Sequence, residues 1–179
     1  EAFKGGEDIH DATASSVYGV PVDEVTPHMR RIAKIMNFGV IYGLSPFGIS
    51  RQTGLTADEG RQFIETYFGQ YPGIRQYIDQ TKAQVGESGY VETLMGRRRY
   101  IPEVRSSNYN VRAAGERMAI NMPIQGTAAD ILKIAMVRIQ ERMDTLKLRS
   151  MMIVQVHDEL IFETPQDELE DLKKLVLDV

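Results

Sequence analysis

Cysteine and tryptophan are absent from this chain of 179 residues, and it has only three histidines. The lack of cysteine excludes disulfides and thiolate metal sites, and so few histidines argue against a histidine-rich zinc site. Any bound metal should therefore be a hard cation with oxygen ligands. The sequence also lacks the ~18 to 20 consecutive apolar residues that a membrane-spanning helix needs, and shows no signal peptide or lipidation pattern. We therefore expect a soluble intracellular protein with a cytoplasmic location and no membrane partner.

Charge is unevenly distributed along the chain, whose net charge is −4. Residues 1–26 carry a net charge of −5, residues 27–117 carry +5 and residues 118–179 carry −4. A basic surface in the middle can bind a polyanion although the whole chain is acidic. Chance unevenness is the alternative. The length and ordinary composition predict one domain with a sizeable core, or parts of two subdomains.

Helical patterns dominate the sequence. Start and stop signals predict a series of helices at about 8–18, from 27 onward, near 46–53, at 57–70 and from the turn at 71–73 to about 87. Strand-like runs predict two hairpins, one at 90–94 with 99–101 and one at 151–156 with 160–163. Pro123 should divide the helical stretch after Asn110 into two helices, and residues 167–179 should form an amphipathic helix. The expected fold class is α+β and mostly helical.

Two cations and two aromatic residues recur at intervals of four: Arg30, Lys34, Phe38 and Tyr42. Because four-residue steps drift only slowly around an α-helix, the four side chains share one broad face. Arginine and lysine bind phosphate oxygens, and aromatic rings stack on a sugar or base. This order of side chains matches the order of parts in a nucleoside triphosphate. The alternative is a solvated helix face that passes into a core face.

The ends of this helix support a ligand site. Thr26 as N-cap and Pro27 at the first helical position place Arg30 near the positive end of the helix dipole, where anions are favoured. Gly39 and Gly43 are costly in or at the end of a helix. We therefore expect another group to approach the backbone closely beside the two rings.

The spacing Arg-x3-Lys-x3-Phe-x3-Tyr-Gly, with Asn37-Phe38-Gly39 inside it, resembles motif B of the family A DNA polymerases, the bacterial DNA polymerase I group. The string Val156-His157-Asp158-Glu159-Leu160 resembles the family's motif C. The resemblance extends over essentially the whole chain. It implies a helical fingers subdomain and part of a palm with an antiparallel hairpin that carries acids. The boundaries implied are a segment leading from palm to fingers (1–26), fingers with a small hairpin near 90–101 (27–108), and an incomplete palm (109–179).

The resemblance implies that five residues bind the nucleotide. Arg30, Lys34 and His10 would contact the triphosphate, and Lys34 could also give a proton to pyrophosphate. Phe38 would stack near the sugar and base, and a phenylalanine there implies discrimination against dideoxynucleotides. Tyr42 would lie at the templating base.

Asp158 is implied to be a ligand of a two-metal Mg²⁺ site, with Glu159 as a weaker candidate. Without the resemblance, adjacent carboxylates at a hairpin turn would be interpreted as solvated acids. The family's other metal-binding aspartate lies on a motif A strand upstream of the segment resembled here. We therefore expect this chain alone to be inactive.

Primer and template contacts are implied for residues in the middle and later parts of the chain. Asn121 and Gln125 have donor and acceptor atoms that can probe the minor groove without sequence preference. Arg117 would contact the primer backbone and His157 would lie beside the primer terminus. Three consecutive arginines would contact template phosphates: Arg97, Arg98 and Arg99. The alternative is a solvated arginine-rich turn without a ligand.

The function that the resemblance implies is template-directed DNA synthesis in replication and repair. Deoxynucleoside triphosphates would be added to a primer 3′-hydroxyl with release of pyrophosphate. The full-length enzyme is expected to be a monomer that works on a primer-template and, in a bacterium, associates with the nucleoid. Alternatives are a single-subunit phage-type RNA polymerase, a catalytically silent nucleic-acid-binding fragment, and a phosphohydrolase whose metal doublet is His157-Asp158.

Overall fold

A computed structural model describes residues 5–43 and 46–179 of the chain. Contacts divide the chain into a first unit, Glu1–Val91 with Arg98–Asn121, and a second unit, Glu92–Arg97 with Met122–Val179. Helices predominate, and the strands form two small two-stranded sheets, which confirms the expected α+β class. No helix within the described ranges is long and apolar enough to cross a membrane.

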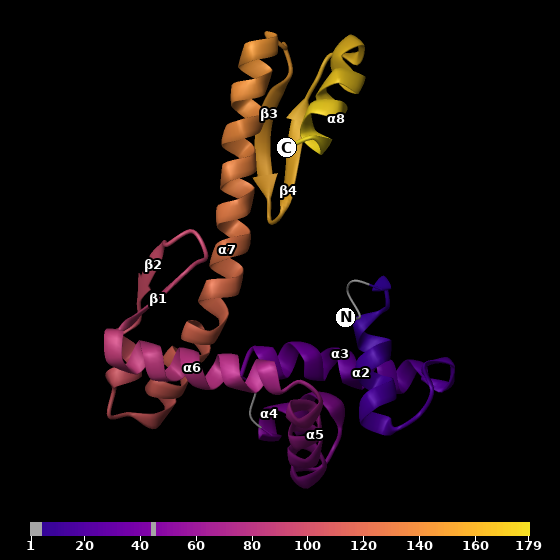
Figure 1. The fold of residues 1–179 in the computed structure, drawn as a ribbon, viewed down its shortest axis with the longest axis vertical. Helices are drawn as coiled ribbons and strands as arrows, with labels where there is room; N and C mark the ends of the chain where they lie inside the picture. Colours follow the sequence, from indigo (N-terminus) through magenta and orange to yellow (C-terminus); the bar gives the residue numbers. More distant parts are fainter. Residues whose placement is uncertain (1–4, 44–45) are drawn as a thin grey trace. The chain divides into compact units, whose positions relative to one another are not determined.

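The first unit is built mainly from helices (Figure 1). Its elements in chain order are α2 (Ile9–Tyr18), η1 (Val22–Glu24), α3 (Pro27–Ile41), α4 (Pro46–Thr53), α5 (Ala57–Gln70), α6 (Pro72–Ser88), β1 (Tyr90–Glu92), β2 (Arg98–Tyr100), η2 (Pro102–Arg105) and the beginning of α7 (Tyr109–Leu146). These bounds agree with the predicted helices and first hairpin to within a few residues.

The ends of α3 follow from local hydrogen bonds. Thr26 is the N-cap, and its side-chain oxygen accepts a hydrogen bond from the backbone N–H of Met29 at 3.3 Å. The helix ends where Gly43 takes a left-handed backbone conformation with φ 71°, which glycine adopts without a steric cost. Tyr42 therefore lies at the C-cap, one residue beyond the helix.

One face of α3 forms the core of the first unit. Ile32, Met36 and Val40 are buried, with exposed fractions of 4% or less, and pack with residues of α4 and α5. Complete burial of such a side chain contributes roughly 1.5–3 kcal/mol. The core thus fixes the rotation of α3 about its axis, and leaves the face with Lys34 and Phe38 outside the core.

Helix α7 is continuous through Pro123, so the predicted division into two helices is wrong. Proline removes one backbone hydrogen bond and typically costs about 3 kcal/mol in a helix interior. The neighbouring residues offset this cost because Ala119, Ile120 and Met122 are buried. The Tyr77 hydroxyl also donates to the carbonyl oxygen of Ile120, one turn before the proline, at 2.8 Å.

The second unit joins the rest of α7 to a hairpin and a short helix. Its elements are β3 (Met151–Val156), β4 (Glu159–Glu163), η3 (Gln166–Glu168) and α8 (Leu169–Leu177). The strands are antiparallel, and Val156 pairs with Glu159. A buried cluster of α7 and α8 residues packs against one set of hairpin side chains: Ile139, Met143, Leu172 and Leu175 with Met152, Leu160 and Phe162. Figure 1 shows the hairpin beside the later turns of α7 and α8.

Candidate nucleotide-binding and acidic sites

The four residues predicted to share one face do so in the first unit. Arg30 is half-buried, Lys34 is exposed, and Phe38 and Tyr42 have exposed fractions of 48% and 39%. The rings of Phe38 and Tyr42 are stacked, with centroids 6.3 Å apart and planes 12° from parallel. This side of α3 therefore offers cationic groups followed by exposed aromatic surface.

Arg30 is held by two carboxylates that were not among the predicted site residues. Its Nη2 lies 2.6 Å from Asp8 Oδ2, and its Nε lies 3.3 Å from Asp11 Oδ1. Asp8 also caps α2, because its Oδ1 accepts backbone N–H groups of His10 and Asp11. The hydrogen bond from Arg30 is the main reason why the pKa of Asp8 falls to about 2. An aspartate directly before a predicted helix is a sequence signal for an N-cap, as Asp8 is for α2. No sequence signal indicates its contact with Arg30.

Lys34 differs from Arg30 because it forms no hydrogen bond or ion pair with the residues that the structure describes. Its ammonium group is exposed and can bind an anion without first leaving a carboxylate. Of the two cations on this face, Lys34 is the one that has no ion pair with an acid among residues 5–43 and 46–179.

His10 reaches the same side from α2. Its ring centroid lies 5.7 Å from that of Phe38, with the planes tilted by 50°. Its Nδ1 lies 3.1 Å from the amide nitrogen of Asn37, a residue with an exposed fraction of 5%. The structure thus brings His10 together with the row on α3. Asn37 lies within the motif, and no role was predicted for it from the sequence.

The close approach expected at a glycine occurs at Gly43. A Cβ atom there would lie 2.9 Å from Cγ of Arg117, on α7. This distance is shorter than ordinary carbon contacts, so Arg117 can take its position only beside a glycine. The side chain of Arg117 remains exposed.

Three other predicted DNA-contacting residues lie in the first unit. The guanidinium carbon of Arg98 lies 4.7 Å from the ring centroid of Tyr90, a cation–π contact. Arg99 has an Nη2–Sδ contact of 3.4 Å with Met118. The Oδ1 atom of Asn121 is buried and has no hydrogen-bond partner among the described residues.

Arg97 belongs to the second unit, where it binds α7. Its Nη2 lies 2.8 Å from Asp130 Oδ1 and 3.0 Å from the carbonyl oxygen of Gly126. Asp130 has an exposed fraction of only 8%, and its second oxygen has no hydrogen-bond partner within the described chain. These contacts hold the loop before β2 against α7, next to the exposed Gln125.

The tip of the second hairpin presents the acidic residues. His157 and Asp158 form a two-residue connection between β3 and β4, and His157 has a positive φ of 54°. The expectation that Glu159 also lies in the turn is wrong, because Glu159 pairs with Val156 as the first residue of β4. The bulge between Met152 and Val154 shifts the register of the strands, which residue spacing alone did not reveal.

The carboxylates of Asp158 and Glu159 are exposed and form no hydrogen bond or ion pair with the residues that the structure describes. Their oxygens fit Mg²⁺, which usually takes one or two protein carboxylates together with water and phosphate. No group of three or more potential metal ligands occurs within residues 5–43 and 46–179. The hairpin can therefore contribute ligands to a metal site that is completed by other groups.

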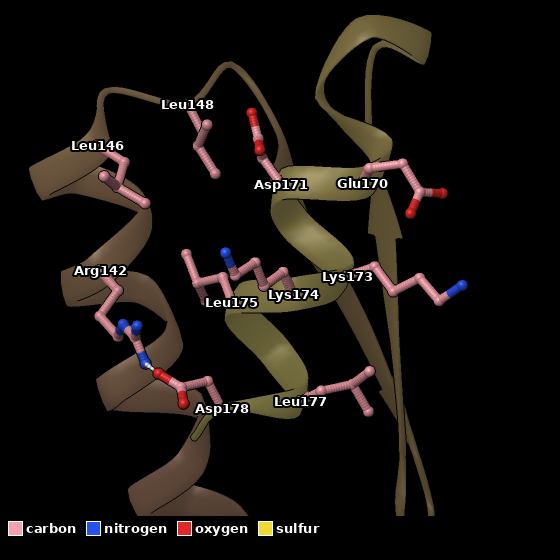
Figure 2. Close-up of a pocket in the computed structure, with 10 residues that line it drawn as sticks. All are labelled: Arg142, Leu146, Leu148, Glu170, Asp171, Lys173, Lys174, Leu175, Leu177 and Asp178. Carbon is pink, nitrogen blue, oxygen red and sulfur yellow. Dashed lines mark ion pairs between the residues drawn. The ribbon is translucent and has the colours of Figure 1, made fainter.

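A cleft of the second unit is separate from these acids. It has a volume of about 780 Å³ and lies between the end of α7 and α8 (Figure 2). Arg142 and Asp178 form an ion pair of 2.8 Å at its lower edge. None of the predicted site residues lines this cleft.

Comparison with known proteins gives one family. The family model described as DNA polymerase family A matches residues 1–179. DNA polymerase I of Lactococcus lactis subsp. cremoris is 48% identical over 177 residues, which cover 98% of this chain and 20% of that protein. DNA polymerase I of Geobacillus stearothermophilus is 46% identical over 179 residues, all of this chain and 20% of that protein.

A solved structure is also similar. It is the polymerase domain of Pol1 from M. smegmatis in complex with DNA primer-template and dNTP. The TM-score is 0.90 at 45% sequence identity, and the match covers 99% of this chain and 31% of that one. The chain thus spans about a fifth of the length of the curated relatives named here.

Proposed function

This chain belongs to DNA polymerase family A, and we propose that it carries part of the site for template-directed DNA synthesis. In this reaction a primer 3′-hydroxyl attacks the α-phosphate of a deoxynucleoside triphosphate, and pyrophosphate leaves. The observation that carries the proposal is the exposed row on α3, in which cationic groups are followed by two stacked rings. The similarity to a polymerase domain bound to primer-template and dNTP supports the same ligands for this chain.

The triphosphate is proposed to bind at the beginning of this row. Lys34 supplies a positive charge that no acid in the described part of the chain pairs with, and Arg30 supplies a fork held at a fixed place by Asp8 and Asp11. A charged donor stabilises the leaving pyrophosphate because negative charge develops on its oxygens in the transition state. We expect Lys34 to give a proton to that group, since it has no competing acceptor within the described chain.

The sugar and base are proposed to contact the aromatic end of the row. Phe38 stacks near the sugar and base and discriminates against dideoxynucleotides, while Tyr42 checks the templating position. Both rings keep a large part of their surface exposed, so a ligand can bury apolar area against them.

The acidic hairpin is proposed to hold metal. Enzymes of this family are generally Mg²⁺-dependent. Asp158 is the main ligand and Glu159 the weaker one, with a second carboxylate from the upstream motif A strand of the parent polymerase. When bound, Mg²⁺ neutralises charge on the phosphates and lowers the pKa of the attacking hydroxyl. We expect this chain to be inactive without that strand.

Primer-template contacts are proposed for residues of both units. In the first unit these are Arg98, Arg99, Arg117 and Asn121, and in the second Arg97, Gln125 and His157. Arg97 and Arg117 already contact protein groups, so their roles include shaping the surface that meets DNA. We also propose that residues 27–108 form the fingers and residues 109–179 part of the palm. The parent enzyme is proposed to be a monomer located in the cytoplasm.

The test grafts this chain into the Geobacillus stearothermophilus enzyme in place of the matching 179 residues. Mg²⁺-dependent primer extension should be abolished by Asp158→Ala. It should be slowed on the order of 10- to 100-fold by Lys34→Ala, which removes a charged hydrogen bond. Glu163→Ala on β4 and Arg31→Ala on α3 are matched controls, since both side chains are exposed and lie outside the proposed sites.

Two results would contradict the proposal. If the graft binds primer-template but both test variants extend it at the unaltered rate, the chain acts as a silent binding module. If the chain by itself extends a primer, the proposed need for an outside carboxylate is wrong. Extension with ribonucleotides in preference to deoxynucleotides would instead favour the RNA polymerase alternative.

A further inference from the structure

Asn37 is a buried amide that links α3 to α2. Its exposed fraction is 5%, and it faces Thr13, which is completely buried. The Thr13 hydroxyl oxygen lies 2.8 Å from the Ile9 carbonyl oxygen and 3.1 Å from Asn37 Oδ1, so its single hydrogen has two possible acceptors. The amide nitrogen of Asn37 lies 3.1 Å from His10 Nδ1. The side chain therefore connects the buried contact between the two helices with a histidine at the edge of the nucleotide-binding face.

This orientation of the Asn37 amide favours one tautomer of His10. An amide nitrogen can only donate, so Nδ1 of His10 must accept. A neutral imidazole that accepts at Nδ1 carries its hydrogen on Nε2. The amide orientation is supported by Ile9, whose carbonyl oxygen lies 3.5 Å from the same amide nitrogen. With the amide reversed, two oxygens would face each other there, which is unfavourable.

This tautomer has a consequence for an anionic ligand. With hydrogen on Nε2, the imidazole presents a donor on the side away from Asn37. With hydrogen on Nδ1, it would present a lone pair, which repels a phosphate oxygen. The His10 ring lies beside Phe38, so it belongs to the same side of α3 as the proposed nucleotide contacts.

We propose that Asn37 is a positioning residue that holds His10 as a neutral Nε2–H donor to the triphosphate of the incoming nucleotide. This inference rests on the proposed function. A purely structural role, in which Asn37 only joins α2 to α3, is the alternative. The two differ because only the first connects the His10 tautomer with nucleotide affinity.

The tautomer is measured first, by nitrogen NMR of the 179-residue chain labelled with ¹⁵N-histidine, at a pH at which imidazoles are neutral. The chain has three histidines, and His10→Gln identifies the signal of His10. We expect a protonated Nε2 and an unprotonated Nδ1. A protonated Nδ1 in the unaltered chain would overturn the proposal without any variant or activity assay.

Asn37→Asp then reverses the hydrogen-bonding role with little change of shape. A carboxylate only accepts, so the hydrogen of the neutral His10 imidazole should move to Nδ1. Because a carboxylate also favours the doubly protonated ring, KM is compared at a pH at which NMR of the variant shows one imidazole hydrogen. In the grafted polymerase we expect the KM for nucleotide to rise about tenfold, with a smaller change in kcat. In a His10→Gln background the same substitution should change KM less than twofold, because the glutamine amide can present a donor in either case.

A matched control separates this effect from general loss of stability. Tyr77→Phe removes another partly buried hydrogen bond of the first unit, to the Ile120 carbonyl oxygen. It should lower the melting temperature and leave the His10 tautomer unchanged. An equal rise in KM for Asn37→Asp with and without His10 would show that Asn37 is only structural. A graft in which Lys34→Ala has no effect would instead contradict the proposed function itself.

Discussion

Gly43 allows a direct measurement of how closely Arg117 is packed. Its φ of 71° costs an alanine about 1–2 kcal/mol of backbone strain, partly offset by about 0.4–1 kcal/mol from the restricted unfolded chain. The added Cβ would also lie 2.9 Å from Arg117 Cγ and force it to move. Overpacking of this kind typically costs about 1–3 kcal/mol. We expect Gly43→Ala to lower the free energy of unfolding by about 2–4 kcal/mol.

Gly19 provides the matched control because it isolates the backbone cost. It has a nearly equal φ of 68°, and a Cβ atom there would have nothing within 4 Å. Gly19→Ala should therefore cost only about 1 kcal/mol. Urea unfolding of both variants gives the difference, which we attribute to the contact with Arg117.

A double-mutant cycle tests this attribution. Arg117→Ala removes the side chain that the new Cβ would meet, so the combined variant with Gly43→Ala should recover about 1–2 kcal/mol relative to additivity. A cost of Gly43→Ala no greater than that of Gly19→Ala, or additive effects of the substitutions at 43 and 117, would refute the assigned contact with Arg117. In the grafted polymerase, Gly43→Ala should also weaken primer-template binding by displacing Arg117.

Three further predictions follow from local contacts. His157→Gly should stabilise the hairpin by up to about 1 kcal/mol in urea unfolding, because it relieves a positive φ, yet slow primer extension by the graft. Asp8→Asn keeps a good N-cap but removes the ion pair with Arg30. The stability that ionised Asp8 contributes is fully present above 3.8, the ordinary pKa of this group, and is lost as the pH falls through about 2, its pKa in the folded chain. The variant lacks this carboxylate and keeps the cap, so it should lose less stability as the pH falls between these two values. Arg97→Met should destabilise the second unit by about 1–3 kcal/mol, because it leaves the buried Asp130 carboxylate without its cation.

Each of these predictions has its own control. A stabilised hairpin with unchanged extension would exclude a role for His157 at the primer terminus. Asp23→Asn, at an exposed carboxylate of η1, should leave the acid dependence of circular dichroism unchanged, and an identical profile for Asp8→Asn would contradict the assigned ion pair. Adding Asp130→Asn to Arg97→Met should restore part of the lost stability, and no recovery would show that the pair is not the cause.

Local signals in the sequence predicted most of the elements correctly. Thr26 and Pro27 begin α3, and Thr56 begins α5 through a capping box with Glu59. These signals succeed because caps involve backbone and side chains within a few residues. Pro123 failed as a signal because a proline sets only a local cost, which the burial of neighbouring residues overcomes. Glu159 was misplaced because the strand pairing, and not the polarity of the residue, determines where the turn ends.

The sequence by itself determined the α+β class, the family resemblance, and the face of α3 that carries Arg30, Lys34 and Phe38. These depend on residue order and on helical periodicity. Only the tertiary structure decided what surrounds them: Asp8 on Arg30, Asn37 on His10, and Arg117 on Gly43. These contacts join residues more than twenty positions apart, so they depend on how helices pack. Helix packing is set by the shape and burial of whole faces, and no local pattern records it.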